Sequence, residues 1–74
     1  MQKKEARLLA DTGALRTPVV RRSEGGWVAE LPGKHRLNPV LETTRGGPRV
    51  FKSLDAAAET LFEIGLLVFT VERP

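Results

Sequence analysis

Residues 53–72 constrain the fold more than any other part of this chain of 74 residues. Ser53 is a favourable helix N-cap, because its hydroxyl can accept a hydrogen bond from a free backbone N–H of the first turn. Three consecutive alanines follow, which are strong helix formers, and Gly65 suits the left-handed position that ends a helix. The pattern predicts one main helix over residues 53–65.

The apolar residues of this predicted helix recur at helical spacing, so they form one face that we expect to pack on a sheet. They are Leu54, Ala57, Ala58, Leu61 and Phe62. Three carboxylates, Asp55, Glu59 and Glu63, occupy the opposite face. We interpret them as a solvated surface rather than as an acid or metal site.

Residues 66–72 follow the helix directly and predict a closing strand. The sequence LLVFTV is rich in β-branched and aromatic residues, which suit a strand. Both faces of its first half are apolar, which is typical of a central strand, a covered strand or a subunit interface. A chain this short has little material for a second layer, so a homodimer through residues 66–71 is one hypothesis.

Earlier segments predict further strands. Residues 16–22 and 27–31 flank the turn sequence SEGG and indicate a hairpin. VLETT and RVFK flank a second turn and indicate another hairpin. We therefore expect an α+β fold, with a small, mainly antiparallel sheet of four to five strands and helix 53–65 packed on one face. The expected core partners of that helix are Trp27, Leu31, Val50 or Phe51, Phe69 and Val71.

The remaining N-terminal segment has good helix propensity over residues 2–10 but only a narrow apolar stripe. Basic residues crowd the end of this segment where the helix dipole prefers anions. Residues 1–13 are therefore either a short helix or a flexible arm that orders on binding. The length allows one domain, spanning residues 1–74.

Composition excludes several classes of function. The chain has no cysteine and one histidine, His35, which is too few for a zinc site built from these residues. Neither serine lies in a nucleophile elbow, and the glycine pairs match no phosphate-binding loop. We expect no enzyme, no catalytic or metal residue, no cofactor and no small-molecule substrate. Absence of cysteine suits a reducing cytoplasm, and no apolar run is long enough to span a membrane.

The charge distribution is the best functional signal. Residues 1–52 hold 11 Lys or Arg against 5 Asp or Glu, whereas residues 53–74 hold 1 against 4. Basic side chains on strands and hairpin turns can follow a phosphate backbone, so we predict nucleic-acid binding, with duplex DNA as the partner. The predicted contact residues are Arg21, Arg22, Lys34, Arg36, Arg45, Arg49 and Lys52.

The sequences GGWVAEL and RGGPRVFKSLDAAAETL, within residues 21–61, carry a resemblance. They resemble the AP2-like, arm-type DNA-binding domains that precede phage and mobile-element integrases. The resemblance implies a three-stranded sheet on one helix, with the sheet entering the major groove. It would place five residues against DNA: Arg21, Arg22, Arg36, Arg49 and Lys52. The chain also resembles, in style, the short accessory proteins of plasmids and integrative elements.

Two alternatives stay open at the level of sequence. The basic residues could be an ordinary surface of mixed charge, since the formal net charge is only +3. The chain could instead be a protein-interaction module or a structural homodimer without nucleic-acid binding. Trp27 could stack on a base if exposed, but we expect it in the core because Ala29 and Leu31 share its face.

Overall fold

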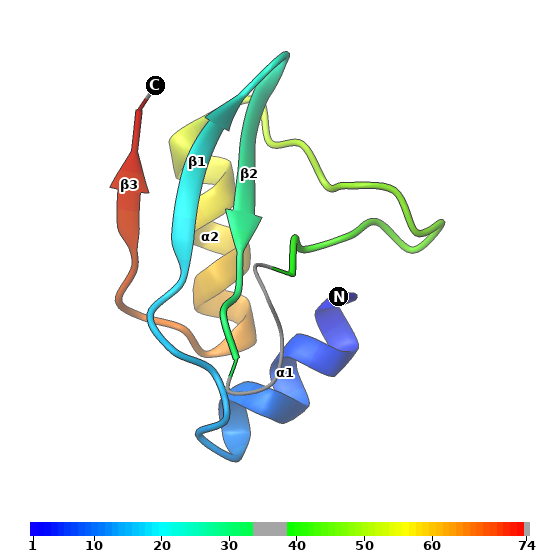
Figure 1. Ribbon diagram of the computed structural model, residues 1–74, viewed down its shortest axis with the longest axis vertical. Coiled ribbons are helices and arrows are strands. Elements are labelled where there is room, and N and C mark those ends of the chain that lie inside the picture. Colours follow the sequence, from blue (N-terminus) through cyan, green and yellow to red (C-terminus); the bar gives the residue numbers. More distant parts are fainter. Residues whose placement is uncertain (34–38, 74) are drawn as a thin grey trace.

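The computed structural model describes residues 1–33 and 39–73. It contains two helices and one three-stranded sheet, in the order α1 (Lys3–Asp11), β1 (Val19–Ser23), β2 (Gly26–Glu30), α2 (Leu54–Ile64) and β3 (Thr70–Glu72). The sheet covers α2, and α1 lies at one end of it (Figure 1). The α+β class and the mainly antiparallel sheet are confirmed.

Helix α2 forms as the sequence predicts, and its ends explain why. The hydroxyl of Ser53 accepts a hydrogen bond from the backbone N–H of Ala56 at 3.1 Å. Gly65 ends the helix in the left-handed conformation, with φ at 105°, and its N–H donates to the carbonyls of Leu61 and Phe62. A side chain at Gly65 would strain this backbone.

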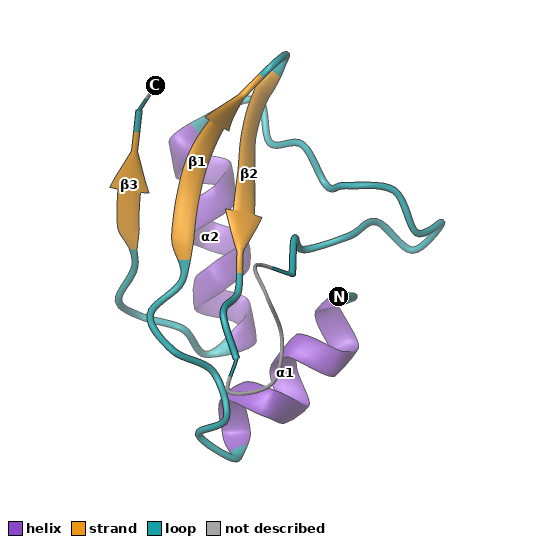
Figure 2. Ribbon diagram, in the orientation of Figure 1, coloured by secondary structure: helices purple, strands orange, loops and turns teal. Residues whose placement is uncertain are grey.

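The sheet has the strand order β2-β1-β3. Strands β1 and β2 form the predicted antiparallel hairpin, with Val20 opposite Ala29 and Arg22 opposite Trp27. Strand β3 joins the other edge of β1 in parallel, with Val20 opposite Val71. One of the three strands, β3, thus follows the main helix in sequence and pairs in parallel (Figure 2).

The prediction of four to five strands is wrong, because VLETT and RVFK do not form strands in this structure. Residues 39–51 run beside β2 and fold back through isolated bridges, including those between Trp27 and Phe51 and between Glu42 and Pro48. Pro39 and Pro48 lack an N–H, so they cannot donate to a continuous ladder. The segment projects from the body of the molecule as a long loop (Figure 1).

The predicted closing strand over residues 66–72 is also longer than the strand observed. Only Thr70–Glu72 pairs with β1, and it lies at the edge of the sheet. Leu66 still belongs to the helix end, since its N–H donates to the carbonyl of Leu61 at 2.9 Å. Leu67 and Val68 are 71% and 72% exposed, so this segment is neither central nor covered within one chain.

The core lies between the inner face of the sheet, α2 and part of α1. Leu31 and Phe51, rather than Val50, belong to it as predicted. The predicted partners Trp27 and Phe69 are half-buried and pack against it. The prediction for Val71 is wrong, because this residue is exposed at the sheet edge. Helix α2 turns Ala57, Leu61 and Ile64 inward and leaves Phe62 half-exposed. The buried apolar residues are Met1, Ala6, Val20, Ala29, Leu31, Leu41, Phe51, Ala57, Leu61 and Ile64.

Candidate nucleic-acid interface

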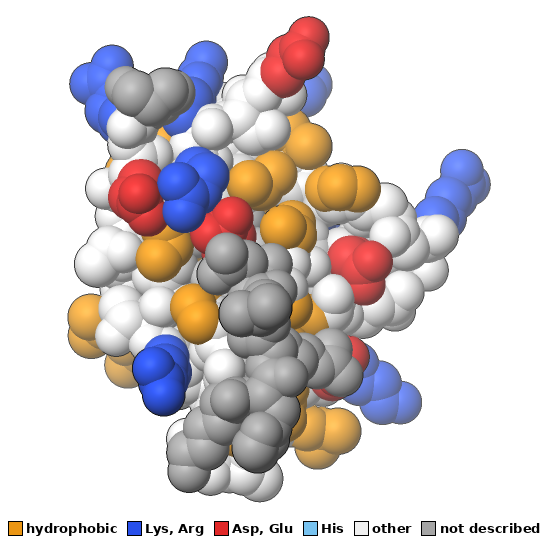
Figure 3. All heavy atoms as spheres, in the orientation of Figure 1, with side chains coloured by type: hydrophobic (Ala, Val, Ile, Leu, Met, Phe, Trp, Pro, Cys, Tyr) orange, Lys and Arg blue, Asp and Glu red, His pale blue; other side chains and the backbone are white. Residues whose placement is uncertain are grey.

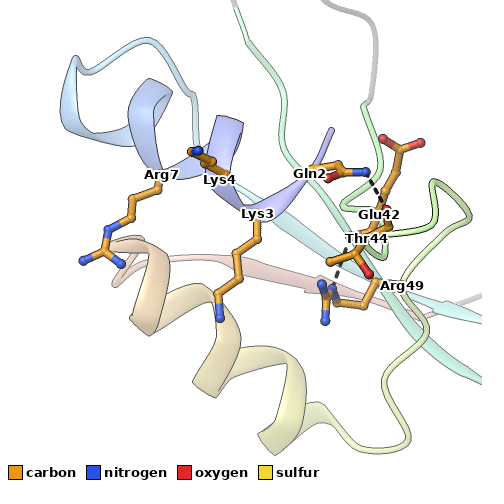
Figure 4. A pocket seen from close by; sticks show the side chains of 7 residues that line it. All are labelled: Gln2, Lys3, Lys4, Arg7, Glu42, Thr44 and Arg49. Carbon is orange, nitrogen blue, oxygen red and sulfur yellow. Dashed lines mark hydrogen bonds between the residues drawn. The ribbon is translucent and has the colours of Figure 1, made fainter.

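A basic groove separates α1 from the loop that follows β2 (Figure 4). Its volume is about 460 Å³. Four cationic side chains and one carboxylate line it, together with two uncharged polar residues. The lining residues are Gln2, Lys3, Lys4, Arg7, Glu42, Thr44 and Arg49.

Local hydrogen bonds hold the two walls of the groove together. The amino group of Met1 donates to the carbonyl of Val40 at 3.0 Å and to Oε1 of Glu42 at 2.7 Å. Nε2 of Gln2 donates to the carbonyl of Thr44 at 3.3 Å. These contacts join residues about forty positions apart, so the groove exists only in the folded chain.

The charges in the groove are only partly compensated. The Met1 amino group pairs with Glu42, and the Lys3 ammonium pairs with Glu63 on α2. The hydrogen bond and charge of Lys3 hold the pKa of Glu63 below its usual range. Arg49 donates through Nε to the carbonyl of Glu42, which leaves its charge unneutralised. Within the described residues, Lys4, Arg7 and Arg49 have no ion pair.

Arg21 lies on the outer face of the sheet, between two glutamates. Its guanidinium donates to Glu30 of β2 at 3.1 and 3.2 Å and to Glu72 of β3 at 3.1 and 3.3 Å. The hydrogen bond and charge of Glu30, with the charge of Glu72, raise the pKa of Arg21 above its ordinary value. Figure 3 views this face, where acidic and basic side chains alternate over the sheet. Arg21 therefore links all three strands, and its positive charge is already balanced.

The other predicted contact residues lie in different places. Arg45 is exposed at the tip of the projecting loop, and Lys52 is exposed just before α2. The guanidinium of Arg22 lies 5.3 Å from the ring centroid of Trp27, at the far end of the hairpin. Lys34 and Arg36 lie outside the described residues, as does His35.

Of the five predicted residues that the structure describes, Arg49 alone lines the basic groove. Sequence reasoning missed Lys3, Lys4 and Arg7 as site residues. The sequence did carry an indication of them. Cations in the first turns of a helix interact unfavourably with its dipole, so their presence there favours a role other than helix stability.

The described residues contain no cluster of three His, Cys, Asp or Glu side chains that could hold a metal ion. None of their buried side-chain polar atoms lacks a hydrogen-bond partner. Among these residues, no helix has the length and apolar character needed to cross a membrane.

Fold and groove together define a small α+β domain with a basic groove beside α1. A family model described as ParC-like matches residues 1–73, and the chain belongs to that ParC-like family. Comparisons with curated proteins and with solved structures found no match.

Proposed function

We propose that this ParC-like chain is a small non-enzymatic protein that binds duplex DNA through the basic groove. The observation that carries the proposal is that Lys4 and Arg7 of α1 and Arg49 of the later loop line one hollow, from two separate segments. Phosphate oxygens are acceptors that lysine and arginine side chains bind with charge-assisted hydrogen bonds. Arg45, next to Thr44 of the groove lining, is a further exposed cation on the projecting loop.

The arrangement favours backbone contacts over base reading. The outer face of the sheet carries two carboxylates around Arg21, so it would repel phosphates. Binding through the groove instead predicts an affinity that depends on salt and little on sequence. Three uncompensated cations would give a slope of roughly −3 for log affinity against log salt.

Fluorescence anisotropy of a labelled mixed-sequence duplex, at two salt concentrations, tests the proposal. The triple variant Lys4→Gln, Arg7→Gln and Arg49→Gln is expected to weaken binding at low salt more than about tenfold and to remove most of the salt slope. A charge control combines Arg16→Gln and Lys52→Gln, which are exposed and line neither the groove nor the pocket at Trp27, and is compared with the double variant Lys4→Gln and Arg7→Gln. Equal losses of affinity in the two double variants would reduce the effect to net charge. Absence of wild-type binding at low salt would refute DNA binding.

A second candidate, a structural homodimer, is favoured by the exposed edge of the sheet. Strand β3 has no neighbour on its outer side within the described chain, and Val71 is 42% exposed. Leu67 and Val68 add an apolar surface next to this edge. Exposed edge strands commonly pair with another chain.

Sedimentation over a wide concentration range checks this candidate. The chain is expected to shift towards twice its mass as concentration rises, and Val68→Lys should oppose the shift. Leu8→Lys is the matched control, because Leu8 is 62% exposed on α1 and away from β3. A monomer at all concentrations would count against the dimer.

A further inference from the structure

A second pocket lies near the turn of the β1–β2 hairpin, where α2 begins beneath the sheet. Its volume is about 650 Å³, and its lining residues are Arg22, Trp27, Leu54, Val71 and Arg73. They come from β1, β2, the start of α2, and β3 with the residue after it. The pocket therefore depends on the parallel pairing of β3 with β1.

The two arginines give this pocket a positive rim. Arg22 is held over the indole of Trp27, with its guanidinium carbon 5.3 Å from the ring centroid. This stacking orients the planar fork and leaves its N–H groups free to donate. Neither Arg22 nor Arg73 has an ion pair within the described chain.

Nearby carboxylates do not fill the pocket. Glu72 precedes Arg73 but bonds to Arg21 on the outer face of the sheet. Asp55 follows Leu54 and Glu24 lies in the hairpin turn, and both are exposed and outside the lining. Two guanidinium groups are thus available for an external anion.

The rest of the lining is apolar. Trp27 is half-buried and supplies aromatic surface, and Leu54 and Val71 supply aliphatic surface. A matching ligand would combine an anionic group for the arginines with a planar ring for the apolar wall. A phosphate accepts a bidentate arginine fork, and a nucleobase stacks on aromatic and guanidinium planes.

We infer that this pocket binds one unpaired nucleotide, with its phosphate on Arg22 and Arg73 and its base against Trp27, Leu54 and Val71. The inference goes beyond duplex binding at the groove and does not rest on it. The two sites share no lining residue, and the groove-side loop and β3 project on opposite sides of the body (Figure 1).

Trp27 is the only tryptophan, so its fluorescence reports on the pocket directly. Titration with thymidine 5′-monophosphate is expected to change its emission saturably. Thymidine alone and inorganic phosphate should each bind at least about tenfold more weakly, because each makes only part of the contacts. Arg73→Gln should weaken nucleotide binding about tenfold or more. Arg22→Lys keeps the positive charge but loses the planar guanidinium fork, so it should also weaken nucleotide binding.

Two control proteins separate this inference from the proposed function. Arg45→Gln and the triple variant of the groove are expected to keep full nucleotide binding, even where duplex binding is lost. No saturable change with the nucleotide would overturn the inference. Equal binding of inorganic phosphate would reduce the pocket to an adventitious anion site. Equal binding of N-acetylphenylalanine would assign it to a peptide carboxylate instead.

Discussion

Gly26→Ala is expected to destabilise the domain by about 3 kcal/mol or more. A Cβ atom at Gly26 would lie 2.1 Å from the backbone oxygen of Phe51. That oxygen accepts a hydrogen bond from the N–H of Trp27 at 2.8 Å, and the N–H of Phe51 donates to the carbonyl of Trp27 at 2.7 Å. The clash would therefore separate β2 from the segment that leads to α2. Urea denaturation measures the loss.

Gly25→Ala is the matched control, one residue earlier in the same turn. A Cβ atom there would meet nothing within 4 Å, although φ is +85°. We expect a cost of only about 1–2 kcal/mol, from placing alanine in the left-handed region. Similar losses of unfolding free energy in both variants would contradict the close approach of Phe51 to Gly26.

Leu61→Ala is expected to cost about 2–5 kcal/mol, because it leaves a cavity between α2 and the sheet. Leu61 is fully buried, and its carbonyl accepts hydrogen bonds from both Gly65 and Leu66. A domain of 74 residues has a total stability of only roughly 4–11 kcal/mol. The variant is therefore expected to be partly unfolded at moderate temperature, as thermal denaturation followed by circular dichroism would show.

Phe62→Ala, at the next position, separates burial from helix propensity. Phe62 is 49% exposed and packs on Phe69 with ring centroids 6.2 Å apart. Losing this partial contact should cost clearly less than losing Leu61, although phenylalanine is the larger residue. A greater loss at Phe62 would mean that α2 presents a different face to the core.

The sequence predicted α2 well because the information that defines this helix is local. Ser53 and Gly65 satisfy the helix ends with their own side chain or backbone, and the alanines between them need no distant partner. The hairpin of β1 and β2 was equally predictable, because its turn residues and its alternation of apolar and polar residues lie within one short stretch.

The rest of the sheet was harder to predict from the sequence, because its strand pairing depends on residues far apart in the chain. VLETT and RVFK have strand-like composition, but Pro39 and Pro48 interrupt their ladders and leave only isolated bridges. In the closing segment, the helix end uses Leu66 and only Thr70–Glu72 reaches β1. No local pattern shows that this pairing is parallel.

The charge pattern of the sequence did not distinguish basic side chains that form ion pairs in the fold from those that do not. Arg21 and Arg22 are neighbours with identical side chains. Pleating turns Arg21 toward Glu30 and Glu72 on one face, and Arg22 toward Trp27 on the other. Glu72 is 51 positions from Arg21 in sequence, so only the parallel β3 brings the two together.

The sequence by itself determined the α+β class, helix α2 with its caps, the first hairpin and the excess of basic residues before residue 53. Tertiary structure alone decided where those basic residues lie. Folding places α1 beside residues 42–49 to form the groove, and places Arg73 beside Arg22 to form the second pocket. The physical reason is that caps and turns are satisfied within a few residues, whereas a binding surface joins side chains that meet only after long loops close.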